Sequence, residues 1–298
     1  MSRAFAASPE TWVFLALGGF MVALWPGAGA PAAPALLVVL ALAVAVTGLP
    51  HGALDPWLAR QSGLWRTRRG LVAFHLAYVA LAALVLVAWR WLPGPSLALF
   101  LAISAWHFAG DWRGHLPGAA RAVAGGALLA LPAWRWPGEV QAIFVMLSGA
   151  DGAAVAEALA TMAPWLAAGM AIVAAFALRR SLTTAIELAA ITALALLLPP
   201  LLFFIVYFCA LHSLRHLRHA ALGADAGARR RMAGVAVGYT LLALVLAAVA
   251  WPWLARAGDA LPVPGTPLAQ LVFIGLAALT LPHMLVVMHA ERAARAAP

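Results

Sequence analysis

Long apolar runs separated by short polar turns form the main pattern of the chain, from residue 11 to residue 289. Most runs approach the roughly 20 residues that an α-helix needs to cross a bilayer. No polar stretch between them is long enough for a separate folded domain. The pattern predicts an all-α, polytopic transmembrane helix bundle of about ten spans in a single domain. The predicted spans are 11–25, 35–50, 71–92, 96–110, 122–133, one net crossing within 138–178, 182–198, 201–221, 232–254 and 268–289.

The two ends of this pattern define the expected domain organisation. Residues 1–33 are predicted to be an N-terminal extension, whose apolar run is an additional membrane helix rather than a cleaved signal peptide. Residues 34–298 are predicted to form the main membrane domain. A proline-rich external loop is expected at 261–267, and Pro199-Pro200 is expected to break the helical pattern between two spans.

The region 138–178 does not divide cleanly into spans. Residues 138–149 look too short to cross, 151–163 look interfacial, and 164–178 can cross. The arginines at 179 and 180 are expected in the cytoplasm, which allows only one net crossing here. One of these pieces is therefore predicted to be re-entrant or to lie in the membrane interface.

Composition and charge support a membrane protein. Hydrophobic residues make up 65% of the chain and charged residues 10%, against roughly 25% charged in a soluble domain. The formal net charge of +9 comes from arginine, since the sequence contains no lysine. Arginines cluster in alternate turns, so both termini are expected in the cytoplasm and the chain in the inner (plasma) membrane. No basic stretch accompanies a folded reading surface, which argues against nucleic-acid binding. A single cysteine, Cys209, excludes an internal disulfide and a cysteine-based metal cluster.

Nine histidines in such a chain are the strongest chemical signal, because ionisable groups within membrane spans are costly and usually functional. His212 and His216 lie in the stretch YFCALHSLRH and are four residues apart. On a helix both imidazoles leave the same face one turn from each other, which is the spacing of a two-histidine metal grip. His219, beside Arg218, is expected to be solvated rather than a ligand.

A second element, histidine followed four residues later by aspartate, occurs twice. His51 and Asp55 lie in LPHGALD, and His107 and Asp111 lie in AWHFAGD. A carboxylate one turn from a ligating histidine can accept its second ring N–H and fix its tautomer. We therefore expect His51 and His107 to join the pair at 212 and 216 around one metal, with each aspartate supporting the histidine of its own motif.

Further histidines and aromatic residues have supporting roles in this prediction. His283, in LPHMLVV, is expected to support the ligands or to face the substrate, and His75 to be a packing residue. Aromatic side chains flank the histidine motifs and are expected to line an apolar substrate tunnel, although helix packing and lipid contact would explain each of them equally well. These are Trp106, Phe108, Phe204, Tyr207 and Phe208.

An all-imidazole set favours particular metal chemistry. A structural zinc site would be closed at four ligands, and haem would need ligands on opposite faces. Four imidazoles leave two positions on an octahedral iron, so iron that handles oxygen beside a lipid-soluble substrate fits best.

The chain resembles the Brp/Blh family of membrane-bound β-carotene 15,15'-dioxygenases at these same motifs. The matching stretches are LPHGALD, AWHFAGD, YFCALHSLRH and LPHMLVV, spread over most of the chain. The chain departs from the family by its first helix and by Ala109-Gly110 ahead of Asp111. The resemblance implies a nonheme Fe(2+) held by His51, His107, His212 and His216. It also implies cleavage of the central double bond of all-trans-β-carotene by O₂ to two all-trans-retinal, and a functional link to a retinal-binding rhodopsin.

Two other functions share some of these features. A diiron desaturase or hydroxylase also uses histidine boxes, but such enzymes need about eight ligating histidines with adjacent pairs, and no two histidines are adjacent here. A transporter could use histidines to relay protons or to pass a metal ion. Metal content and substrate flux distinguish the three.

Overall fold

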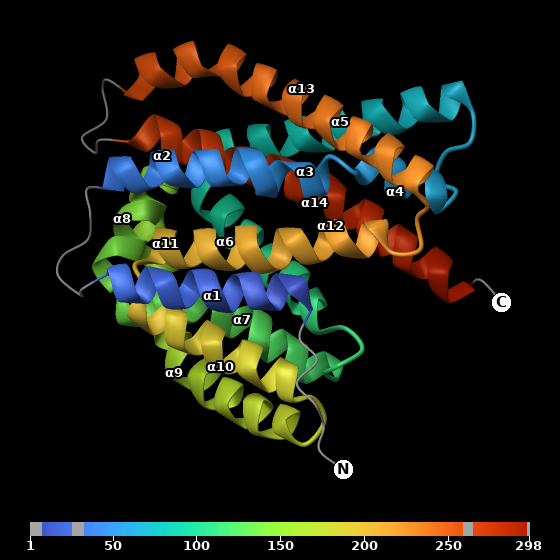
Figure 1. Ribbon diagram of the computed structural model, residues 1–298. Coiled ribbons are helices and arrows are strands. Elements are labelled where there is room, and N and C mark those ends of the chain that lie inside the picture. The colour runs from blue at the N-terminus through green and yellow to red at the C-terminus, as the bar shows by residue number, and fades with distance from the viewer. Residues whose placement is uncertain (1–7, 26–32, 259–264, 297–298) are drawn as a thin grey trace.

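The computed structural model describes residues 8–25, 33–258 and 265–296, and every regular element in these ranges is a helix. The all-α fold is therefore confirmed. The helices run back and forth across one bundle, with α1 (Pro9–Leu24) across its middle and α13 (Ala226–Gly258) along one edge (Figure 1). Residues 261–264 of the predicted external loop lie outside the described ranges.

Six helical segments of the described chain are long and apolar enough to cross a membrane. The count of ten predicted crossings is not confirmed, because several apolar helices are too short to be counted with these six. Two of them are α1 and α10 (Leu182–Leu197). The six segments are Pro34–Gln61, Arg68–Trp91 (α5), Asp151–Leu178 (α9), Pro200–Ala221, Ala226–Pro252 and Thr266–Ala296 (α14).

The arginine-rich turns lie at one end of the bundle. Figure 1 places the junction between α4 (Asp55–Gln61) and α5, the junction between α12 (Ser213–Ala221) and α13, and the end of α14 on the same side. The loop before α5 and the start of α13 both carry arginines. This common placement is what the positive-inside pattern of the sequence predicts.

The ambiguous region 138–178 forms two helices rather than three pieces. Residues 151–163 are continuous with 164–178 in the 28-residue α9, so 151–163 do not form a separate piece. Pro164 lies inside α9, and a membrane helix tolerates an internal proline when its surroundings satisfy the freed backbone groups. The short piece is α8 (Pro137–Ser148), which has 12 residues. Gly149 ends it with φ of 65°, a conformation that favours glycine, and reverses the chain into α9.

Polar side chains from other helices satisfy the last carbonyl groups of α8. Trp89 on α5 donates to the carbonyl of Leu147 at 2.9 Å, and Gln270 on α14 donates to that of Met146 at 3.0 Å. The last four carbonyl groups of any α-helix have no N–H partner within that helix. An apolar environment offers no water to bond them instead.

Replacing Gln270 by leucine is expected to lower the free energy of unfolding by about 1–3 kcal/mol, because the carbonyl of Met146 loses its donor. Thermal unfolding in detergent, followed by circular dichroism, measures the effect. Gln141→Leu is the matched control, since Gln141 is exposed on α8 itself. Equal midpoints for the two variants would contradict the role of Gln270.

α6 (Pro93–Ala109) and α7 (Gly118–Arg135) pack closely near His107. A Cβ added to Gly125 on α7 would lie 2.1 Å from the carbonyl oxygen of Ala105 on α6. Only glycine fits this approach, which lies within one turn of His107.

Candidate metal centre

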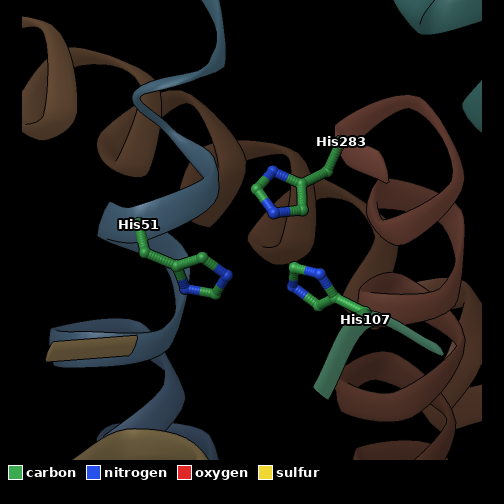
Figure 2. A group of neighbouring side chains, drawn as sticks. All are labelled: His51, His107 and His283. Atoms are coloured by element: carbon green, nitrogen blue, oxygen red, sulfur yellow. The ribbon is translucent and has the colours of Figure 1, made fainter. Parts of the chain in front are cut away.

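Histidines from four separate parts of the chain converge within the bundle. His51 lies on α3 (Leu49–Gly52), directly after the π-helix η1 (Val44–Gly48). His107 lies near the end of α6, and His283 follows Pro282 inside α14. These three imidazoles point into a common space (Figure 2). The ligand nitrogens of this triplet all lie within 4.8 Å of one another.

The remaining two histidines approach the same space from the chain segment that begins at Pro200. His212 is the last residue of the π-helix η3 (Ile205–His212), and His216 follows on α12. Their ring centroids are 4.5 Å apart. Together with His107 they form a second triplet whose ligand nitrogens lie within 4.8 Å. Each of the two π-helices ends within a few residues of a histidine of the cluster, and wide turns of this kind are frequent at functional sites.

The separations within the cluster fit one metal ion. At an imidazole nitrogen to metal distance of about 2.1 Å, two neighbouring nitrogens lie about 3.0 Å apart, and ring centroids lie about 4.6 Å apart for adjacent ligands and about 6.6 Å for opposite ones. The Nε2 atoms of His107 and His212 are 3.0 Å apart. Eight of the ten centroid separations among the five histidines lie between 4.5 Å, for His212–His216, and 6.2 Å, for His216–His283. Both triplets contain His107, so within the described residues the two groups overlap.

Asp111 orients His212 rather than the histidine of its own motif. The α6 helix ends at Ala109, and a 3₁₀ turn (Gly110–Trp112) moves Asp111 off the face that carries His107. Its carboxylate accepts the Nδ1–H of His212 at 3.0 Å and the hydroxyl of Tyr207 at 2.8 Å. Since Nδ1 of His212 carries the proton, its Nε2 presents a lone pair to the centre. His212 is fully buried, which removes water as a competing partner.

Asp55 likewise supports a different histidine from the one expected. The helix that carries His51 ends at Gly52, and Asp55 begins the next helix, so the two side chains do not share a face. The Asp55 carboxylate accepts the Nδ1–H of His283 at 2.7 Å and the hydroxyl of Tyr78 at 2.8 Å. The predicted pairing within each motif is therefore wrong, although each aspartate is bonded to a histidine of the cluster.

Two of the histidines outside the cluster, His75 and His219, have different partners. His75 lies between the carbonyl of Leu71 at 2.8 Å and the hydroxyl of Tyr239 at 2.6 Å. His219 is exposed and lies 3.2 Å from a guanidinium nitrogen of Arg218. Neither belongs to the two triplets.

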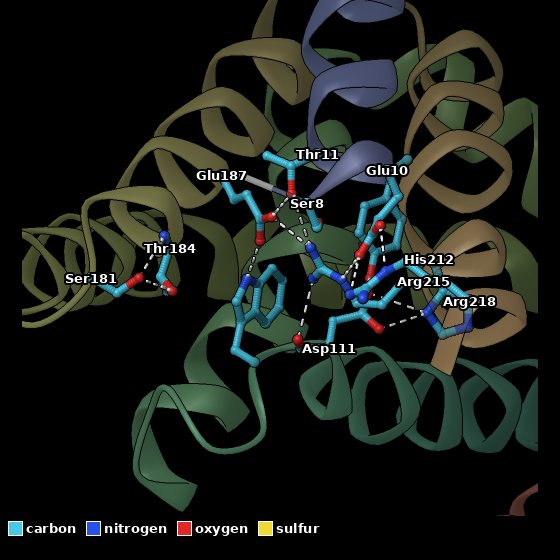
Figure 3. A network of polar contacts seen from close by, with 12 residues as sticks. Ser8, Glu10, Thr11, Asp111, Ser181, Thr184, Glu187, His212, Arg215 and Arg218 are labelled. Atoms are coloured by element: carbon cyan, nitrogen blue, oxygen red, sulfur yellow. Dashed lines mark hydrogen bonds and ion pairs between the residues drawn. The ribbon is translucent and has the colours of Figure 1, made fainter. Parts of the chain in front are cut away.

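A buried ionic network lies behind the cluster (Figure 3). Arg215 donates to Glu187 at 2.5 Å and to the backbone carbonyl of Asp111 at 3.2 Å. Glu187 also accepts from Trp112 at 3.1 Å and from Thr11 at 2.5 Å. The network thus connects the backbone of the residue that orients His212 to α10 and α1.

The N-terminal helix α1 contributes two residues to this network. Glu10 forms a bidentate ion pair with Arg218, with both N–O distances at 2.8 Å, and is itself 3% exposed. Thr11 is fully buried against Glu187. The predicted N-terminal extension is therefore joined to the polar network behind the candidate centre.

The sequence patterns did not predict that Arg215 and Glu187 form a buried ion pair behind the site. The position of Glu187 nevertheless indicated that it has a partner or a function. Glu187 is the only charged residue of the apolar helix α10. A lone carboxylate inside a membrane span is paired or functional by default. That rule singles out Glu187, but it does not say which arginine pairs with it.

An apolar cavity of about 300 Å³ opens beside the cluster. His51, His107 and His283 form part of its wall. Of the aromatic residues expected along a tunnel, Phe108, Phe204 and Phe208 line it. Trp106 instead is 62% exposed on the outer surface of α6, and Tyr207 is buried against Asp111. The placement of these two residues differs from the expectation because their side chains leave the helices on other faces.

The far wall of the cavity includes α13, a helix with one face left outside the bundle. Tyr239, Thr240 and Leu246 line the cavity. The neighbouring Leu241 and Val245 are 56% and 58% exposed. A single helix thus separates this side of the cavity from the apolar surroundings of the bundle.

Known proteins match the chain over most of its length. A family model described as beta-carotene 15,15'-dioxygenase matches residues 42–290, which include all five histidines of the cluster. A protein of this name from the uncultured marine bacterium 66A03 is 31% identical over 268 residues, covering 83% of this chain and 91% of the relative. A probable beta-carotene 15,15'-dioxygenase Blh from Halobacterium salinarum is 29% identical over 297 residues, covering 85% and 84%. No solved structure matches significantly. The resemblance inferred from the histidine motifs is confirmed: the chain belongs to the beta-carotene 15,15'-dioxygenase family.

Proposed function

We propose that this dioxygenase cleaves the central 15,15' double bond of all-trans-β-carotene with O₂, and that a single nonheme Fe(2+) serves the reaction. Its ligands would include His51, His107, His212 and His216. The observation that carries the proposal is the convergence of these imidazoles beside an apolar cavity in a chain of this family. When bound, iron(II) would supply the O₂-activating redox chemistry that no side chain here offers.

The donor set supports one redox-active ion rather than a structural metal. All candidate ligands are neutral imidazoles, and no thiolate approaches them: Cys209 is the only cysteine and does not belong to either triplet. Imidazole suits iron, and its affinity for a metal depends on the tautomer that the second nitrogen fixes. Asp111 fixes that tautomer for His212.

The remaining task of the protein is to position an apolar substrate and to exclude water. Phe108, Phe204 and Phe208 line the cavity with flat apolar surfaces that suit a conjugated chain. Positioning the reacting bond at the cluster replaces a bimolecular encounter by a prearranged one. One C=C bond breaks and two C=O bonds form, with both oxygen atoms taken from O₂. The balance therefore needs no external reductant and no general acid or base.

The proposed setting is the inner (plasma) membrane, with both termini in the cytoplasm. Its support is the apolar character of the long helices and the gathering of arginine-rich turns at one end of the bundle. Retinal formed there would remain in the membrane, where a retinal-binding rhodopsin is the proposed consumer.

Expression in a carotene-accumulating bacterial host tests the activity. We expect the orange colour to fade and retinal to appear in equal carbon yield, measured by chromatography of membrane extracts. Carotene that persists without retinal would contradict the proposal. Metal analysis of the purified protein separates the diiron alternative, which predicts two irons per chain instead of one. Substrate flux in proteoliposomes without retinal would instead indicate a transporter.

A further inference from the structure

The structure contains a second histidine–aspartate–tyrosine chain that the four-histidine site does not use. In the first chain Asp111 accepts from His212 at 3.0 Å and from Tyr207 at 2.8 Å. In the second, Asp55 accepts from His283 at 2.7 Å and from Tyr78 at 2.8 Å. The two chains come from different helices and have the same order of donors and acceptors.

The second chain determines which nitrogen of His283 is free. A carboxylate can only accept, so the Nδ1 of His283 carries the proton, and in the neutral imidazole its Nε2 then carries a lone pair. This Nε2 atom is buried and has no hydrogen-bond partner. A buried acceptor without a partner costs free energy, so a site of this kind indicates a missing ligand.

The position of His283 fits the same metal as the other imidazoles. Its ring centroid lies 5.3 Å from that of His51 and 5.0 Å from that of His107, and their ligand nitrogens lie within 4.8 Å of one another. The centroid of His216 is 6.2 Å away, which is within the separation of about 6.6 Å that two imidazole ligands of one ion can reach. Figure 2 shows the three imidazoles of this triplet directed at one point.

We propose that His283 is a fifth imidazole ligand of the metal, held by Asp55 and Tyr78 in the way that Asp111 and Tyr207 hold His212. This inference rests on the proposed metal centre. It changes the number of coordination positions that the protein leaves open on the metal. Five imidazoles leave one of the six positions of an octahedral ion open, whereas four leave two. The protein would then present a single place beside the cavity for an exogenous small molecule.

The competing explanation is that His283 only lines the cavity. His75 does so as well, and it provides the matched control, because both of its ring nitrogens already have partners in Leu71 and Tyr239. Replacing a histidine such as His75, whose two ring nitrogens already have partners, removes no metal ligand. The two explanations therefore differ in metal affinity rather than in cavity shape.

Titration of the metal-free protein with Co²⁺, followed by its visible absorption, tests the proposal without turnover. We expect His283→Ala to weaken Co²⁺ binding by at least tenfold and to raise the absorption intensity, because the ion loses a ligand. Added imidazole should restore the wild-type spectrum. Asp55→Asn keeps the shape of the side chain and is expected to weaken binding by roughly 10–100-fold, as for other partners of ligating histidines. His75→Ala should bind Co²⁺ as the wild type does.

The outcomes separate this inference from the proposed function. Wild-type affinity and an unchanged spectrum in a folded His283→Ala protein would overturn the fifth ligand and leave the other four in place. A wild-type protein that binds no metal would overturn the whole centre. Circular dichroism identifies a misfolded variant. If His283→Ala does not fold, Asp55→Asn decides the question, and wild-type Co²⁺ affinity in that variant would overturn the fifth ligand.

Discussion

His212→Ala is expected to abolish retinal formation and to reduce the iron bound per chain to a small fraction of the wild-type amount. The imidazole is fully buried and connects Asp111 to the Nε2 atom of His107, and alanine offers neither a ligand nitrogen nor a donor to Asp111. Retinal yield and iron content of the purified protein measure the effect. His51→Ala should behave in the same way, because His51 belongs to the other triplet of the centre.

His219→Ala is the matched control for this experiment. His219 lies two turns beyond His212, on the helix that continues from it, and it is exposed beside Arg218. We expect normal retinal yield and iron content. Removal of iron by a chelator should silence the wild-type enzyme, and added Fe²⁺ should restore it. Full turnover by His212→Ala would mean that the ligands are misassigned.

Arg215→Ala is expected to cause the largest loss of stability, about 3–5 kcal/mol, because it leaves a buried carboxylate without its cation. Arg215 is 6% exposed and pairs with Glu187, which is 3% exposed. The substitution also removes the donor to the carbonyl of Asp111. Thermal unfolding in detergent measures the loss.

The double variant Arg215→Met with Glu187→Gln distinguishes an unpaired charge from simple loss of packing. Removing both charges should recover a large part of the stability, since a buried ion pair contributes little beyond neutral residues of similar volume. Arg230→Ala serves as the control, because Arg230 is exposed at the start of α13. A double variant no more stable than Arg215→Ala would contradict the pairing.

The sequence was sufficient to predict the class of fold because apolar run length depends directly on bilayer thickness. It also predicted the break at Pro199-Pro200, since α10 ends at Leu197 and α11 (Pro200–Phe204) begins at Pro200. It failed where helices end or change period. The pairing of His51 with Asp55 assumed one continuous helix, but the helix stops at Gly52 and resumes at Asp55.

Sequence patterns could not predict hydrogen-bond partners that lie far apart in the chain. No spacing rule connects Asp55 with His283, which lies 228 residues away. The π-helices η1 and η3 also have no local signature, because their wide turns depend on packing between distant segments. The histidines and their apolar sequence surroundings could be recognised from the sequence. Which side chains donate hydrogen bonds to each aspartate could be seen only in the structure.

The exposed outer face of α13 has a kinetic consequence. A carotene dissolved among lipid tails would reach the cavity from the apolar side whose wall α13 forms, without entering the aqueous phase. The concentration that governs saturation is then the mole fraction of carotene in the bilayer, and not its amount per volume of suspension. Adding empty lipid at constant total carotene should therefore slow the enzyme by surface dilution, and the released retinal should diffuse away in the same two-dimensional phase.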